Sequence, residues 1–244
     1  RGVGLMRAGG DDALAEAGRS LERAVTVLEP LVAAQPEVRR NVAAAWANRG
    51  VVLSLENDAA GAVRAHRQAV EAFRPLTQND NPAGCRAFAA LLLNLGQAAG
   101  AAGDVDGALA ATRDALALVS PAETEDPHSA VMTLRARHAL CVTLGGLVAK
   151  NQGENAARSA HLAEAGDVVE DGLALVRSLE GNGVPPAEEG ARLFEFGAWL
   201  YRTQQPQFLA EFLLEHLGED PVRARIAASA VRLARQAIVQ RGFS

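Results

Sequence analysis

Three arginines recur at one position of a repeating pattern, and their chemistry is suited to binding a charged ligand. Each stands ten residues before a glycine, and the three are Arg40, Arg86 and Arg135. A planar guanidinium can donate paired hydrogen bonds to a carboxylate or a phosphate. At a spacing of roughly 10 Å in water, neighbouring charges repel by only about 0.4 kcal/mol, so the ladder also tolerates having no ligand. Arginines that bind an anionic ligand and arginines that are solvated or paired within the chain both remain open interpretations.

Amide side chains follow the arginines in the same segments. Asn48 and Asn94 are 46 residues apart, and Gln97 comes three residues after the second of them. We expect these amides to supply polar contacts to a partner. The alternative is that they serve only packing and solubility.

The other reactive residue types give little support for catalysis. None of the five histidines forms the HxxxH spacing that places two metal ligands on one helical face; they are His66, His128, His138, His161 and His216. Cys85 and Cys141 lack CxxC spacing and are expected to be small buried apolar residues. Asp11 and Asp12 with Glu16 resemble an acidic metal motif only faintly, and Asp12 is better explained as a helix cap. We therefore predict no catalytic residue, no metal and no cofactor.

The elements that carry these side chains repeat with a period near 46 residues. Asp12, Asp58 and Asp104 are each 46 residues apart. Small residues and prolines keep the same register in further tracks: Ala17, Ala62 and Ala108; Ala24, Ala69 and Ala115; Pro30, Pro75 and Pro121; Pro36, Pro82 and Pro127. Several tracks in one register indicate a tandem structural repeat.

The residue types explain why these positions repeat. Gly50 and Gly96 fall in the middle of expected helices, where glycine costs about 1 kcal/mol relative to alanine, so a neighbouring helix is expected to approach closely there. Asp58 and Asp104 precede helical runs and suit the N-cap position. The prolines suit helix ends and the first turns of the next helices. The pattern predicts an all-α chain of paired helices.

At these positions the chain resembles the tetratricopeptide repeat (TPR) family. Trp46, Gly50, Leu53, Ala62 and Ala69 fall at the spacings of that family's packing residues. The Asn-x-Gly at residues 48–50 and 94–96 resembles the longer type found in kinesin light chains. The resemblance covers roughly residues 1–180 well and 185–217 weakly, and the repeat is longer than the usual 34 or so residues.

The resemblance implies an α-α superhelix, a TPR-like helical repeat solenoid, with Arg40 and its equivalents on the concave groove. Asn48 and Asn94 match an asparagine that some family members use to hold a peptide backbone or C-terminus. Ala90 stands where those members carry a lysine, which argues against capture of a C-terminal carboxylate. Sequence-tolerant peptide binding stays open.

The expected organisation is a repeat array over residues 1–219 and a C-terminal capping helix over 220–244. The repeats cover about 1–36, 37–81, 82–126, 127–182 and 183–219. The last is divergent and gathers the aromatic residues at 194–212. The final helix carries Ile226, Leu233 and Ile238 on one face, as a helix that caps a stack should.

Composition limits the class of function. The net charge is −5, which argues against direct nucleic-acid binding, and no apolar run approaches a membrane span. Lys150 is the only lysine, which we interpret as a coding bias typical of a bacterial source, and we expect a cytoplasmic protein. The chain begins at Arg1 rather than methionine, so an upstream continuation is expected.

The function predicted is a non-catalytic scaffold that binds a protein or peptide in the concave groove. The residues expected to line that groove are Arg40, Asn48, Arg86, Asn94, Gln97 and Arg135. The alternatives are a ligand- or peptide-sensing regulatory domain of a larger signalling protein and, third, an all-α enzyme. The sequence does not indicate the oligomeric state.

Overall fold

The computed structural model describes residues 11–77, 81–120, 126–150, 156–183, 188–204 and 212. Within these ranges the chain consists of α-helices and short 3-10 turns, without a strand, as the sequence predicts. The chain divides into two compact units, Arg1–Ala139 and Leu140–Ser244, which are described separately below. The expected capping helix at 220–244 and the helix expected at 206–217, apart from Phe212, lie outside the described residues.

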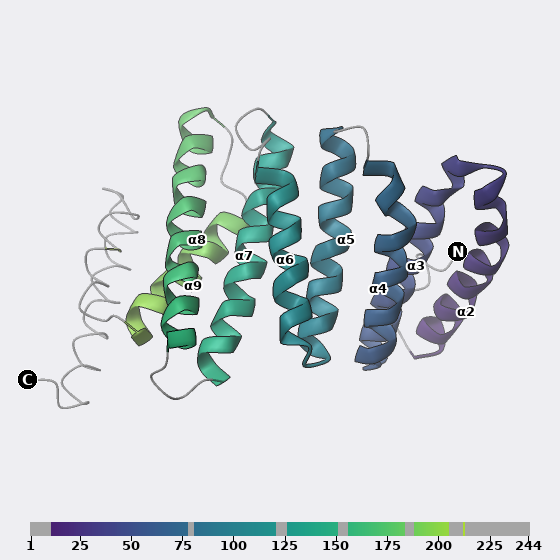
Figure 1. The fold of residues 1–244 in the computed structure, drawn as a ribbon, viewed down its shortest axis with the longest axis horizontal. Helices are drawn as coiled ribbons and strands as arrows, with labels where there is room; N and C mark the ends of the chain where they lie inside the picture. Colours follow the sequence, from purple (N-terminus) through teal and green to yellow (C-terminus); the bar gives the residue numbers. More distant parts are fainter. Residues whose placement is uncertain are drawn as a thin grey trace, which may run out of the picture. The chain divides into compact units, whose positions relative to one another are not determined.

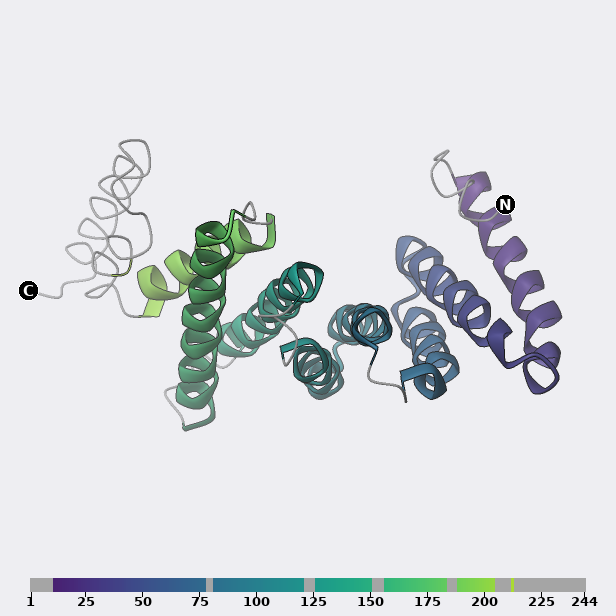
Figure 2. The same ribbon diagram turned by 90° about the horizontal axis from the view of Figure 1, so that it is seen from above.

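The first compact unit is built from antiparallel helices that follow one another in space as they do in sequence. Its helices within the described residues are α2 (Asp11–Leu28), α3 (Arg39–Leu55), α4 (Ala59–Phe73), α5 (Pro82–Ala101), α6 (Val105–Val119) and the first part of α7 (Pro127–Lys150). Each contacts the next from α2 to α6, and these neighbours lie side by side (Figure 1, Figure 2). Among the described links, 3-10 turns are formed by η1 (Glu29–Ala33), η2 (Pro36–Val38) and η3 (Arg74–Thr77).

Helix starts in this unit are fixed by caps at repeat-equivalent positions. The carboxylates of Asp58 and Asp104 accept hydrogen bonds from the backbone N–H of Gly61 at 2.8 Å and of Gly107 at 3.0 Å. Both glycines lack a Cβ that would collide with the capping carboxylate. The repeat pattern identified the aspartates but not the glycines, although these also step by 46 residues.

The prolines and the first aspartate agree with the prediction only in part. Pro82 and Pro127 are the first residues of α5 and α7, as expected. Pro36 instead begins a 3-10 turn, and α3 starts at Arg39. The prediction that Asp12 is an N-cap was wrong, because α2 already starts at Asp11.

Paired helices approach closely at the repeated glycines, in corresponding places. A Cβ on Gly50 would lie 2.6 Å from the imidazole ring of His66 on α4. A Cβ on Gly96 would lie 3.0 Å from Cγ2 of Thr112 and 3.3 Å from the backbone oxygen of Ala108, both on α6. His66 and Thr112 are themselves 46 residues apart. The glycine track therefore marks crevices that receive a side chain from the second helix of each pair.

The core of the first unit continues between helix pairs. Phe73 of α4 and Phe88 of α5 stack with their ring centroids 6.1 Å apart. Around them lie buried apolar residues from α3 to α7, among them Ala43, Val70, Leu92, Val119 and Ala136. The core is thus shared along the stack, which is the arrangement expected of repeats that each contact their neighbours.

The described part of the second compact unit comprises the end of α7, α8 (Ala156–Gly181) and α9 (Glu188–Gln204). Gly145 again marks a close approach, but the ring of Phe196 on α9 lies 2.9 Å from the position of its missing Cβ. Gly197 of α9 faces Val169 of α8 and Phe212. Phe196 and Trp199 of α9 therefore pack against Gly145, and Phe212 packs against Gly197.

Replacing Gly50 by alanine should destabilise the first unit. Overpacking a tight site typically costs about 1–3 kcal/mol, more than the roughly 1 kcal/mol that alanine adds to helix propensity. Gly100 of α5 is the matched control, because its added Cβ would meet only Ala108 Cβ, at an ordinary 3.8 Å. The free energy of unfolding measured in urea should be lower than that of the parent for Gly50→Ala and higher for Gly100→Ala. Equal stabilities would contradict the close approach.

The buried imidazole of His66 should make unfolding depend on pH. Burial lowers the pKa of His66 from its ordinary value of 6.5. The stability that its neutral form contributes is complete above pH 6.5 and declines as the pH falls below 6.5, because the unfolded chain then binds the proton more readily. We expect His66→Thr, which introduces the residue type found at the equivalent position 112, to lose less unfolding free energy across the pH range below 6.5. If the free energy of unfolding has the same pH dependence in the two proteins, burial of the His66 imidazole does not cause it.

Candidate functional site

Helix α3 presents two opposite faces to its surroundings. Successive residues of an α-helix are turned by about 100°, so Arg40, Ala44 and Asn48 lie on one side. Val51 and Leu55 continue that side and are 40% and 55% exposed. Trp46, Arg49 and Leu53 lie on the opposite side, towards α2 and α4. Of the six residues predicted to line a groove, α3 carries Arg40 and Asn48, and both lie on its exposed side.

The corresponding residues of α5 share one face in the same way. Arg86, Ala90, Asn94 and Gln97 fall within about one quarter of the helix circumference. They are exposed or half-buried, and α3 contacts α5 directly. The side-chain amides of Asn48, Asn94 and Gln97 make no hydrogen bond to any residue that the structure describes.

The three arginines have different surroundings. Arg86 pairs with the carboxylate of Asp126 and lies 3.3 Å from the hydroxyl of Ser129. The guanidinium of Arg40 lies 6.0 Å from the ring centroid of Phe73, a cation-π distance. Arg135 of α7 is exposed and has an interaction partner within the chain. The groove role of these arginines stays a prediction, and Arg86 is already compensated by a carboxylate.

The residue that pairs with Arg86 also caps the next helix. Asp126 accepts hydrogen bonds from the Ser129 hydroxyl at 2.7 Å and from the backbone N–H groups of His128 and Ser129. These bonds, first that of the Ser129 hydroxyl, and the charge of Arg86 lower the pKa of Asp126 from its ordinary 3.8 against the opposing effect of desolvation. The equivalent residue 45 positions earlier is Asn81, which caps α5 through Ala83 and offers Arg40 no charge.

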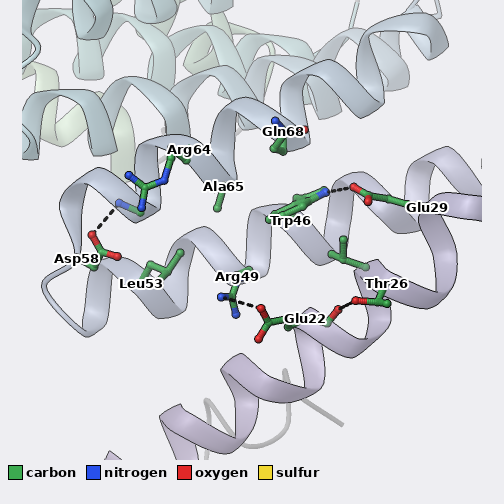
Figure 3. A pocket seen from close by; sticks show the side chains of 12 residues that line it. Glu22, Thr26, Glu29, Trp46, Arg49, Leu53, Asp58, Arg64, Ala65 and Gln68 are labelled. Carbon is green, nitrogen blue, oxygen red and sulfur yellow. Dashed lines mark hydrogen bonds and ion pairs between the residues drawn. The ribbon is translucent and has the colours of Figure 1, made fainter.

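A cavity of about 630 Å³ lies on the other side of α3, between α2 and α4. Figure 3 shows its lining: Glu22, Thr26 and Glu29 from α2 and η1, Trp46, Arg49 and Leu53 from α3, and Arg64 and Gln68 from α4. None of the six residues predicted for the groove lines it. The signal in the sequence was a departure from the repeat, since Arg49 and Trp46 correspond to Leu95 and Leu92.

Polar contacts fix the floor of this cavity. The indole N–H of Trp46 donates to Oε1 of Glu29 at 2.8 Å (Figure 3). Arg49 donates to the backbone oxygen of Gly18 at 3.1 Å, and its second terminal nitrogen lies 3.6 Å from Glu22. Arg64 forms no ion pair with any described residue, and its side chain is exposed.

The described residues offer neither a metal cluster nor a membrane-spanning helix. No group of three or more histidine, cysteine, aspartate or glutamate residues in these ranges could hold a metal ion. None of the described helices is long and apolar enough to cross a membrane.

The ion pair between Arg86 and Asp126 should link the α5–α6 pair to α7 in a pH-dependent manner. Because the folded pKa of Asp126 is lowered, its contribution is present above pH 3.8 and is lost as the pH falls through the folded value. We expect Arg86→Gln to lower the melting temperature at neutral pH and to differ less from the parent at acid pH. A constant difference across that range would contradict the assignment. Arg67→Gln, on an exposed face of α4, is the control.

Comparison with known proteins supports the fold without supplying a function. No family model matches the chain, and no curated protein matches it in sequence. Among solved structures, it is similar to the nearly identical TPR-like repeats of a candidate kinesin light chain from Podosopora anserina, with a TM-score of 0.61 and 17% identity over 99% of this chain and 95% of that one. A single-substitution variant of those repeats gives the same values. The fold expected from the sequence is confirmed: the chain is a helical repeat protein with the TPR-like fold of kinesin light chain repeats.

Proposed function

We propose that the first compact unit is a non-catalytic binding scaffold that holds an extended peptide or partner segment across the exposed faces of α3 and α5. The observation that carries the proposal is a pair of side-chain amides, Asn48 and Asn94, at equivalent places on neighbouring helices. Neither makes a hydrogen bond to a described residue. An amide can donate to a carbonyl and accept from an N–H, which are the two groups that an extended backbone presents.

The residues around the amides suit the side chains of such a segment. Val51 and Leu55 are exposed large apolar residues on the α3 face. Covering them stabilises a complex by about 25 cal/mol for each Å² of apolar surface that a partner buries. Ala44 and Ala90 are small enough to let a backbone approach. This combination of apolar area with a few polar groups is typical of recognition surfaces.

Charge distinguishes the α3 part of this surface from the α5 part. Arg40 retains a cation that no described carboxylate compensates, whereas Arg86 already pairs with Asp126. An acidic side chain of the partner is therefore expected near the start of α3. Stacked helical repeats generally serve protein interaction through such extended surfaces, which supports a binding role over a catalytic one.

The proposal is tested by removing both amides together. A partner would first be identified by co-purification from the native host with mass spectrometry, and its binding segment then titrated by calorimetry. Two lost hydrogen bonds of about 0.5–1.5 kcal/mol each should weaken binding roughly tenfold in the Asn48→Ala, Asn94→Ala variant. Its melting temperature should stay close to that of the parent, because neither amide bonds to a described residue of the chain.

Two controls sharpen this test. Arg40→Ala should reduce the salt dependence of binding, since an exposed charge acts mainly through screened attraction. Arg67→Ala removes the same charge from α4 and should leave binding unchanged. Undiminished affinity in the double asparagine variant would overturn the proposed surface.

A further inference from the structure

The cavity between α2, α3 and α4 carries charges of opposite sign on its two walls. Glu22 and Glu29 stand on the α2 side, and Arg64 and Gln68 stand on the α4 side (Figure 3). Between them lies a floor formed by Trp46, Leu53 and Arg49, whose guanidinium forms an ion pair with Glu22 at 3.6 Å. A volume of about 630 Å³ falls within the range of roughly 300–1,000 Å³ that is usual for ligand sites.

Several polar atoms of these walls have no partner among the described residues. Glu29 spends one carboxylate oxygen on the Trp46 indole, and its other oxygen has no partner among the described residues. Glu22 is 64% exposed and forms an ion pair with Arg49 through one carboxylate oxygen at 3.6 Å, and its other oxygen has no partner among the described residues. Arg64 and Gln68 have no side-chain partner in the part of the chain that the structure describes. The one carboxylate at the α4 end, Asp58, is already engaged by the N–H of Gly61.

We propose that this cavity is a second binding site, separate from the exposed α3–α5 surface, and that it takes an extended peptide segment in which an acidic residue adjoins a basic one. The basic side chain faces Glu22 and Glu29, and the acidic side chain faces Arg64. Successive side chains of an extended chain point in opposite directions, so adjacent residues reach opposite walls. The backbone between them lies over Trp46 and Leu53.

The experiment uses the indole N–H of Trp46 as the reporter, because it bonds directly to Glu29. Binding is followed by NMR on the full chain, and its two tryptophan signals are distinguished with the Trp199→Phe variant. The probes are two blocked tetrapeptides of identical composition. One has the order alanine, glutamate, lysine, alanine; the other separates the charges, as glutamate, alanine, lysine, alanine.

The adjacent-charge peptide should shift the Trp46 signal saturably, and the separated-charge peptide should bind more weakly, since its two charges point the same way. Arg64→Glu should weaken the adjacent-charge peptide about tenfold or more, the effect of losing a charged hydrogen bond. Arg67→Glu, which makes the same charge change on α4 outside the cavity, should have no effect. Circular dichroism melts of both variants confirm that they are folded, which is expected because both side chains are exposed.

Three results would overturn the site. They are the absence of a saturable shift of Trp46, equal binding of the two peptides, and equal binding by Arg64→Glu and Arg67→Glu. The Asn48→Ala, Asn94→Ala variant should bind the adjacent-charge peptide like the parent, which separates this site from the proposed surface on α3 and α5.

Discussion

The close approach of paired helices at Gly50 and Gly96 is the constraint on which the rest of the first compact unit depends. A glycine within a helix sacrifices about 1 kcal/mol of helix propensity. That loss is offset because the His66 ring and the Thr112 side chain pack where a Cβ would otherwise stand. The contact also fixes the rotation of α3 and α5 about their own axes, since only the glycine-bearing side of each helix leaves room for the side chain of the paired helix.

This fixed rotation gives the Asn-x-Gly spacing a physical meaning. Two residues along an α-helix correspond to about 200° of rotation, which is close to the opposite side. When Gly50 and Gly96 are turned inward, Asn48 and Asn94 must therefore be turned outward. The amides are held at matching places by packing on the far side of the helix, without a bond of their own to any described residue. Positioning of this kind is independent of whether a ligand is present.

The sequence was sufficient for features that depend on the repeat itself. The period of 46 residues predicted the helix pairs, the glycine contacts, the caps at Asp58 and Asp104 and the helix starts at Pro82 and Pro127. Each of these follows from local backbone chemistry or from one side chain replicated in register. The prediction for Asp12 was wrong because the cap pattern was extended to α2, which starts at Asp11 and therefore includes Asp12.

Features that depend on differences between repeats could not be predicted in the same way. The pairing of Arg86 with Asp126 joins residues 40 positions apart on different helix pairs, and no local pattern indicates that the two side chains meet. The cavity likewise exists where Trp46 and Arg49 replace the Leu92 and Leu95 of the next pair. A periodic pattern indicates what the repeats share, and a site arises where one of them departs from it.

Helix α3 carries two surfaces with separate chemistry. Its outer side combines Asn48 with exposed Val51 and Leu55, whereas its other side places Trp46 and Arg49 in a charged cavity. A segment bound on one side cannot contact the other, because the helix and its packed neighbours lie between them. Coupling between the two would require α3 to rotate, and the fit of His66 against Gly50 opposes that rotation. Binding at one surface should consequently leave the affinity of the other unchanged, so that their binding free energies add, as at sites without shared partners.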